Sequence, residues 1–236
     1  MRASLGLQSQ DSGAVGSGAH RLSEIAARLG APATALARPL VRLQELGLLD
    51  RQQPFGDAER GGKRSLYRIG DTFSRMWFRI VAPHRAALAT GSRATRAALW
   101  TRHAGRLVSE AWEDLCRAAT PRLTSSLFRG AGPWGPALRY WKGHGPEWDL
   151  VAESIAGDAL LLGEVKWSER PYTEAALEDA IRTLLAKGAP HERWASGRRL
   201  VHTLFVPRLA AKSRRLSLAG RMSEIVTAED IRTALR

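Results

Sequence analysis

Residues 147–167, EWDLVAESIAGDALLLGEVKW, contain two apolar segments separated by a short turn-forming stretch. The segments 147–154 and 159–167 have the length and the apolar content of β-strands, and Gly157 between them favours a tight turn. We therefore expect these residues to form an antiparallel β-hairpin at the centre of the fold.

Three charged residues belong to the open end of this hairpin: Asp149 on its first strand, and Glu164 and Lys166 on its second strand. A two-residue loop at 156–157 places Asp149 opposite Glu164, whereas a loop at 157–158 places it opposite Lys166. In both registers the three side chains share one face of the sheet, because side chains alternate along a strand. A slip of one residue would move Asp149 to the other face.

This combination of side chains suits phosphodiester chemistry. Two carboxylates a few ångström apart bind a hard cation such as Mg²⁺ or Mn²⁺ through oxygen. The cation polarises a phosphodiester and lowers the pKa of a bound water, and a nearby ammonium stabilises the charge that develops on phosphorus. The alternative is that Glu164 and Lys166 are solvated charges at a strand end, because an acid-x-Lys tripeptide is common on exposed strands.

The sequence around the hairpin alternates helical and strand patterns and indicates an α/β layer structure. Helices are expected at 105–119 and 173–188, a strand at 199–207, and a last strand and helix within 223–235. The expected buried stripe of the first of these helices consists of Val108, Ala111, Trp112, Leu115 and Ala119.

The N-terminal part of the chain has another pattern. Helices are expected at 22–30 and 34–47, with Leu36, Leu40, Leu43 and Leu46 of the second helix turned inward, and short strands at 48–53 and 65–70. Helix, turn, helix and hairpin are the order of a winged helix-turn-helix, which we assign to residues 21–70. Pro39 lies inside the second helix, where proline is unfavourable.

A winged helix of this kind has two sets of basic residues that could contact DNA. The second helix would enter the major groove, and the hairpin loop would contact phosphate. The corresponding residues are Arg38 and Arg42 on the helix and Arg60, Lys63 and Arg64 in the loop. The alternative is a protein-docking module that does not contact DNA.

Two further segments complete the predicted organisation. Residues 1–20 are rich in Gly and Ser and are expected to be disordered. Residues 71–100 form a connecting helical segment with Asp71 as its N-cap and Pro83 as a bend or an end. The expected core residues of this segment are Phe73, Met76, Trp77 and Ile80. The sequence GGKRS at 61–65 lacks the spacing of a phosphate-binding loop, so no nucleotide-binding loop is expected.

The composition limits the function classes. The chain has 236 residues and a net charge of +13. The charge is +8 over residues 1–100 and +5 over 171–236, whereas nine basic residues balance nine acidic ones in between. Basic flanks suit a polyanion such as nucleic acid, although they can also serve solubility alone. A single cysteine and the absence of a signal peptide or a long apolar run predict a cytoplasmic protein without a membrane span.

Taken together, these motifs resemble a known family. Asp on one strand followed by Glu-x-Lys on the next resembles the PD-(D/E)XK nuclease fold. YRIGDTFSRMWFRIV, AWEDLCR, RYWKGHGPEWDLVA and LLLGEVKW, in this order, resemble the uncharacterised domain at the C-terminus of archaeal-type P-loop ATPases, in which a winged helix precedes a nuclease-like domain. The resemblance implies a winged helix followed by a restriction-endonuclease-like α/β domain with a central mixed sheet at residues 101–236.

The resemblance also implies a set of site residues. Asp149 and Glu164 would be metal ligands, Lys166 the catalytic lysine, and Glu113 the glutamate that the fold carries on its first helix. Members of the family have an ATPase domain before the winged helix, which this sequence does not contain. We therefore expect a DNA-binding protein with a Mg²⁺-dependent phosphodiesterase domain. The alternative is a catalytically inactive DNA-binding or regulatory module that acts with a partner P-loop ATPase.

Overall fold

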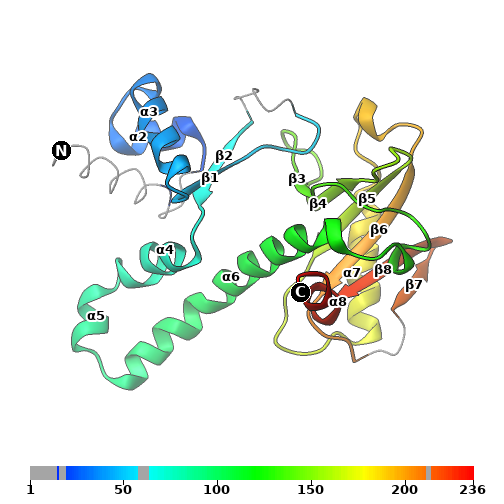
Figure 1. The fold of residues 1–236 in the computed structure, drawn as a ribbon. Helices are drawn as coiled ribbons and strands as arrows, with labels where there is room; N and C mark the ends of the chain where they lie inside the picture. The colour runs from blue at the N-terminus through cyan, green and yellow to red at the C-terminus, as the bar shows by residue number, and fades with distance from the viewer. Residues whose placement is uncertain (1–14, 16–19, 58–63, 211–213) are drawn as a thin grey trace. The chain divides into compact units, whose positions relative to one another are not determined.

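The computed structural model describes Val15 and residues 20–57, 64–210 and 214–236 (Figure 1). The chain divides into two compact units: Met1–Gln53 with Ala58–Val108, and Pro54–Asp57 with Ser109–Arg236. The boundary between them falls inside the long helix α6, Arg93–Ala119, as does the domain start expected at residue 101.

The first unit contains two helices and a two-stranded antiparallel sheet. These elements are α2 (Leu22–Leu29), α3 (Ala33–Glu45), β1 (Leu49–Gln52) and β2 (Leu66–Ile69). Helix α3 continues through Pro39, and Leu36, Leu40 and Leu43 are buried against the rest of the unit. Leu46 is not turned inward as expected, because α3 ends before it and leaves its side chain 49% exposed. The assignment of these elements to a winged helix stays a prediction.

Short helical segments follow β2. They are α4 (Thr72–Met76), a π-helical turn (Trp77–Val81) and α5 (Arg85–Thr90). Asp71 caps α4 as predicted, since its side chain accepts a hydrogen bond from the Ser74 main-chain nitrogen at 2.6 Å. Ile80 is buried, but the expectation that Phe73 is a core residue is wrong, because it is 63% exposed. The π-helical turn at Trp77–Val81 changes the spacing between the α4 residues and Ile80, so Phe73 and Ile80 do not share one buried face.

The second unit is a mixed α/β structure around a six-stranded mixed sheet (Figure 1). The strand order is β3-β4-β5-β6-β8-β7, in which β5, β6 and β8 are parallel and the other pairs are antiparallel. The bounds are β3 (Leu138–Tyr140), β4 (Trp148–Glu153), β5 (Ala159–Val165), β6 (Arg199–Val206), β7 (Arg215–Leu218) and β8 (Arg221–Thr227). Strands β3 and β7, three and four residues long, were not predicted.

Helices cover both faces of this sheet. The C-terminal part of α6 and helix α8 (Ala228–Ala234) pack on one face, where Trp112, Cys116 and Ile231 join the apolar residues of the sheet. Helix α7 (Glu174–Ala186) packs on the other face through Leu177, Ala180, Ile181 and Leu184. No helix in the described part of the chain is long and apolar enough to span a membrane.

The buried stripe of α6 differs from the expected one. Trp112 and Ala119 are buried as predicted, but Leu115 is 47% exposed and Cys116 is fully buried. The predicted stripe contained Leu115 and left out Cys116. A buried cysteine behaves as a small apolar residue, so Cys116 takes the core position. The shift matters because Glu113 precedes Cys116 by three residues and therefore borders the packed face of the helix.

Candidate active site

The register of the β4–β5 hairpin is the first of the two expected ones. Leu150 pairs with Gly163 and Val151 with Leu162, a register that sets Asp149 opposite Glu164. The alternative that set Asp149 opposite Lys166 is wrong. The loop is also longer than two residues: the Ser154 nitrogen still bonds to the Ala159 carbonyl, so residues 155–158 make the connection.

The strand β4 is irregular at Asp149. Leu138 on β3 pairs with Val151, but Tyr140 pairs with Trp148, so two residues of β4 oppose one residue of β3. This is the arrangement of a β-bulge, which re-aims side chains locally. The strict alternation used to place Asp149 on a shared face is therefore interrupted at this residue.

Asp149 nevertheless reaches the open end of the hairpin. Its Oδ2 accepts a hydrogen bond from the main-chain nitrogen of Val165 at 2.9 Å, so the carboxylate contacts the chain between Glu164 and Lys166. The side chains of Glu164 and Lys166 form an ion pair at 2.8 Å. The structure thus brings three of the four predicted catalytic residues together, by a hydrogen bond that strand parity alone does not predict.

Glu164 is a buried carboxylate with two ammonium partners. Its side chain is 7% exposed; Lys166 Nζ contacts Oε1, and Lys187 Nζ contacts Oε2. Lys187 follows α7 and also donates a hydrogen bond to the Glu147 carbonyl at 2.6 Å. Lys187 was not predicted. The available signal was that lysine is rare in this arginine-rich chain, which has five lysines in all.

The charges at this site shift one another's proton affinity. Burial raises the pKa of Asp149, and the neighbouring Glu164 carboxylate raises it further. Burial disfavours the charged form of Lys166, but the hydrogen bond and the charge of Glu164 outweigh that effect, so the pKa of Lys166 is raised. Asp149 therefore gives up its proton less readily than a solvated aspartate, and Lys166 keeps its proton more firmly than a solvated lysine.

Glu113 lies beside this cluster. Burial raises the pKa of Glu113, and the charge of Asp149 adds to the effect. Arg117 joins the two residues, since its Nη1 donates to the Asp149 carbonyl at 2.9 Å and contacts Glu113 at 3.4 Å. In the described residues, however, no three His, Cys, Asp or Glu side chains form a group that could hold a metal ion. Glu113 is thus a neighbour of Asp149, and a three-carboxylate ligand set is not formed.

The main chain at Lys166 is anchored from helix α6. Trp112, only 5% exposed, donates its indole N–H to the Lys166 carbonyl at 3.1 Å. Lys166 N in turn donates to the Phe205 carbonyl on β6 at 2.9 Å. Both main-chain polar groups of Lys166 are satisfied, which fixes the backbone from which its ammonium projects.

A divalent cation fits the donors at this site. Asp149 and Glu164 supply carboxylate oxygens, the ligands that Mg²⁺ and Mn²⁺ prefer. Burial and then the charge of Glu164 raise the pKa of Asp149, and a bound cation would favour the charged form of this carboxyl. To hold a cation together with Asp149, Glu164 would have to give up one of its two lysine contacts.

Five basic residues were predicted to contact nucleic acid, and the structure describes three of them. Arg38 and Arg42 lie exposed on α3, and Arg42 forms an ion pair with Glu45 at 3.2 Å. Arg64, two residues before β2, is half-buried. Arg60 and Lys63 lie outside the described residues.

A comparison with protein families gives a match for part of the chain. Residues 77–182 match DUF234, a family of archaeal and bacterial proteins of unknown function. That segment contains α6, β4 and β5, and so every predicted catalytic residue. Comparison with curated proteins finds no match. The solved structure of the SdaI restriction endonuclease aligns over 89% of this chain and 81% of its own, with 14% identity and a TM-score of 0.21.

Proposed function

We propose that the chain is a DNA-binding protein whose second unit is a Mg²⁺- or Mn²⁺-dependent phosphodiesterase. The observation that carries this proposal is the convergence of Asp149, Glu164 and Lys166 at the open end of the β4–β5 hairpin. Two neighbouring carboxylates and an ammonium are the side chains that metal-assisted hydrolysis of a phosphodiester requires. The resemblance to PD-(D/E)XK nucleases agrees with this chemistry.

Each side chain has a defined role in this proposal. Asp149 and Glu164 bind the cation, which, when bound, supplies an acidified water and polarises the phosphate. Lys166 donates to a phosphate oxygen and stabilises the negative charge that develops there. Its raised pKa keeps it protonated at neutral pH. Glu113 and Arg117 position Asp149 from helix α6.

The first unit supplies DNA binding in the proposal. Its two helices and antiparallel hairpin are the elements of a winged helix, and Arg38 and Arg42 are exposed on α3. Helices of this kind present basic residues to the major groove and to phosphates. A cytoplasmic location, in contact with DNA, belongs to the same proposal.

The two ammonium contacts of Glu164 favour a second candidate. Lys166 and Lys187 already neutralise this carboxylate, so it lacks a free oxygen for a cation. The second candidate is therefore a catalytically inactive DNA-binding or regulatory module that acts with a partner P-loop ATPase. It predicts DNA binding that falls with salt and does not respond to divalent metal.

A cleavage assay separates the two candidates. The purified chain is incubated with plasmid and single-stranded DNA, with Mg²⁺, Mn²⁺ or EDTA, beside Asp149→Ala and Lys166→Ala. Matched controls are Asp179→Ala and Lys142→Ala, which remove the same charges from exposed positions of the second unit.

The proposed phosphodiesterase cleaves DNA only with metal, loses activity in Asp149→Ala and Lys166→Ala, and keeps it in both controls. DNA binding without cleavage at any metal concentration would replace it with the second candidate. Cleavage that persists in both site variants would show that the hairpin residues are not the active site.

A further inference from the structure

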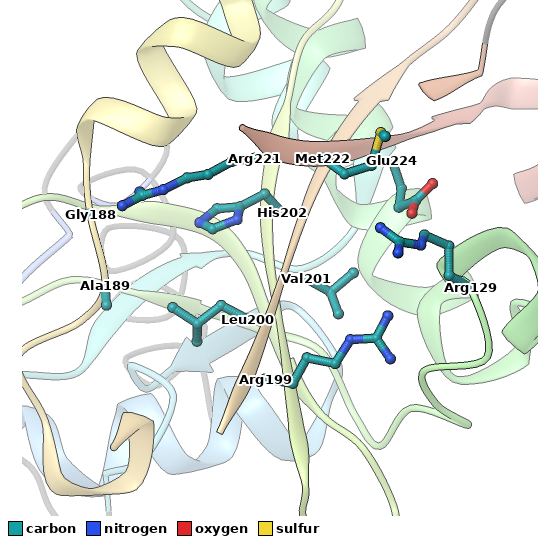
Figure 2. A pocket seen from close by; sticks show the side chains of 10 residues that line it. All are labelled: Arg129, Gly188, Ala189, Arg199, Leu200, Val201, His202, Arg221, Met222 and Glu224. Atoms are coloured by element: carbon teal, nitrogen blue, oxygen red, sulfur yellow. The ribbon is translucent and has the colours of Figure 1, made fainter. Parts of the chain in front are cut away.

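The second unit contains a pocket of about 460 Å³ that the proposed active site does not use. It lies where β8 begins beside β6, between the loop after the 3₁₀ turn at Ser125–Phe128 and the segment that follows α7. Figure 2 shows Arg129 and Arg199 on one side of Val201, and Arg221 on the other side.

The side chains of the acid-lysine cluster do not line this pocket. Along the parallel pair β5–β6, Leu162 pairs with His202, and Glu164 pairs with Leu204. The lining residue of β6 that lies nearest to the cluster, His202, is therefore two residues from Leu204, which is roughly 7 Å at the rise of a parallel strand. The pocket and the cluster are neighbours along the sheet.

The lining of the pocket carries positive charge that no acidic partner cancels. Arg129, Arg199 and Arg221 form no ion pair among the residues that the structure describes. The acidic residue of the lining, Glu224, is 4% exposed, and Arg215 neutralises it at 2.8 Å. Three guanidinium groups without an acidic partner thus line the cavity, Arg129 and Arg199 at the Val201 side and Arg221 at the His202 side of β6, and positive charge of this kind favours an anion.

A buried histidine in the lining lacks a hydrogen-bond partner. His202 is 7% exposed, and its Nε2 has no partner within the described structure. Figure 2 shows its ring beside Arg221, facing Gly188 and Ala189. Burial lowers the pKa of His202, and the charge of Arg221 lowers it further, so the ring is neutral at neutral pH and can still donate one N–H. A ligand oxygen at this place would satisfy a buried polar group that is otherwise unpaired.

We propose that this pocket binds the phosphate groups of a nucleotide. Guanidinium groups and an imidazole N–H are suited to phosphate oxygens, since charged hydrogen bonds from arginine are short and strong. The pocket has the volume of a small-molecule site, and Leu200, Val201 and Met222 give it apolar surface for a base or a sugar. The proposal does not depend on the phosphodiesterase activity. Its phosphate source is a free nucleotide or a nucleic-acid strand, which share this chemistry.

The test is calorimetric titration of the full chain with pyrophosphate, ADP and adenosine in EDTA, so that no metal at the acid-lysine cluster contributes. The variants are Arg199→Ala and Arg221→Ala, and the matched control is Arg122→Ala, an exposed arginine that does not line the pocket. Pyrophosphate and ADP are expected to bind, adenosine is not, and each pocket variant weakens binding by about tenfold. Circular dichroism checks that each variant is folded.

Competition identifies the source of the phosphate. If a short single-stranded oligonucleotide displaces bound ADP, the pocket serves a strand; if it does not, the ligand is a free nucleotide. Absence of binding at millimolar ADP, or equal weakening in Arg122→Ala, would overturn the proposal.

An independent measurement uses the unaltered chain. The imidazole nitrogens of His202 should shift in NMR spectra on addition of pyrophosphate, whereas those of His144, which does not line the pocket, should not. A His202 signal that ignores pyrophosphate would contradict the proposal even if the arginine variants failed to fold.

Discussion

Glu164 on β5 and Lys187 at the end of α7 contact each other although they are 23 residues apart in sequence. Lys187 binds the carboxylate oxygen that Lys166 leaves free. A buried carboxylate thus receives one ammonium from Lys166, directly after its own strand, and one from Lys187, directly after a helix packed on the sheet. This link connects the position of α7 to the electrostatics of the candidate active site.

Removal of the helical ammonium should destabilise the protein. In Lys187→Gln, the buried Glu164 keeps only Lys166, and we expect the free energy of unfolding to fall by about 1–3 kcal/mol. The measurement is urea denaturation at pH 7. Lys142→Gln is the control, since Lys142 is 57% exposed in its pair with Glu192, and such pairs contribute less than about 1 kcal/mol. Equal losses in both variants would contradict the prediction.

The raised pKa of Asp149 predicts a pH-dependent effect on stability. The folded carboxyl keeps its proton to a higher pH than the unfolded one, so the stability of the protein falls as pH rises from the ordinary aspartate pKa through the raised pKa. In Asp149→Asn this loss of stability with rising pH is absent, because the amide does not titrate. The amide oxygen can still accept the hydrogen bond from the Val165 main-chain nitrogen. Its melting temperature should exceed that of the parent at pH 7, and the difference should shrink below the ordinary aspartate pKa.

The matched control for this measurement is Asp179→Asn, whose side chain is 81% exposed. It should leave the pH profile of the melting temperature nearly unchanged. A difference between Asp149→Asn and the parent that stays constant with pH would mean that Asp149 is not the source of the effect.

Gly163 is required by close packing in the middle of β5. A Cβ at this position would lie 3.0 Å from Phe205 Cε2 and 3.1 Å from Leu150 Cβ. We expect Gly163→Ala to cost about 1–3 kcal/mol of unfolding free energy through overpacking. Gly105 in α6 has open space instead, since nothing lies within 4 Å of a Cβ placed there. Gly105→Ala should therefore stabilise the helix by about 0.5–1 kcal/mol. Thermal unfolding of both variants checks the difference in sign.

Pro39 lies within the continuous helix α3. An interior proline removes a helical hydrogen bond and costs on the order of 3 kcal/mol, so Pro39→Ala should raise the unfolding free energy of the first unit. Hydrogen exchange of the α3 amides measures this locally. Pro32→Ala at the N-cap, where no helical bond is lost, should have a much smaller effect. Faster exchange in Pro39→Ala would refute the prediction.

Local patterns were enough to predict many of the elements. The hairpin of residues 147–167 and the helix that ends before Gly188 follow from apolar spacing and turn residues, whereas the turn residues left two registers of the hairpin open. Strands β3 and β7 were missed because segments of three and four residues with partly exposed side chains have no clear period. The stripe of α6 was displaced because Cys116, and not Leu115, faces the sheet.

The sequence by itself determined that Asp149 and Glu164 belong to two adjacent strands and that Lys166 lies at the end of the second one, because the apolar pattern of each strand is encoded locally. Only the tertiary structure decided the rest of the site. The bulge at Asp149 depends on pairing with β3, and Lys187 reaches Glu164 because α7 packs across the sheet. Contacts between distant segments depend on how whole elements pack, which no local period specifies.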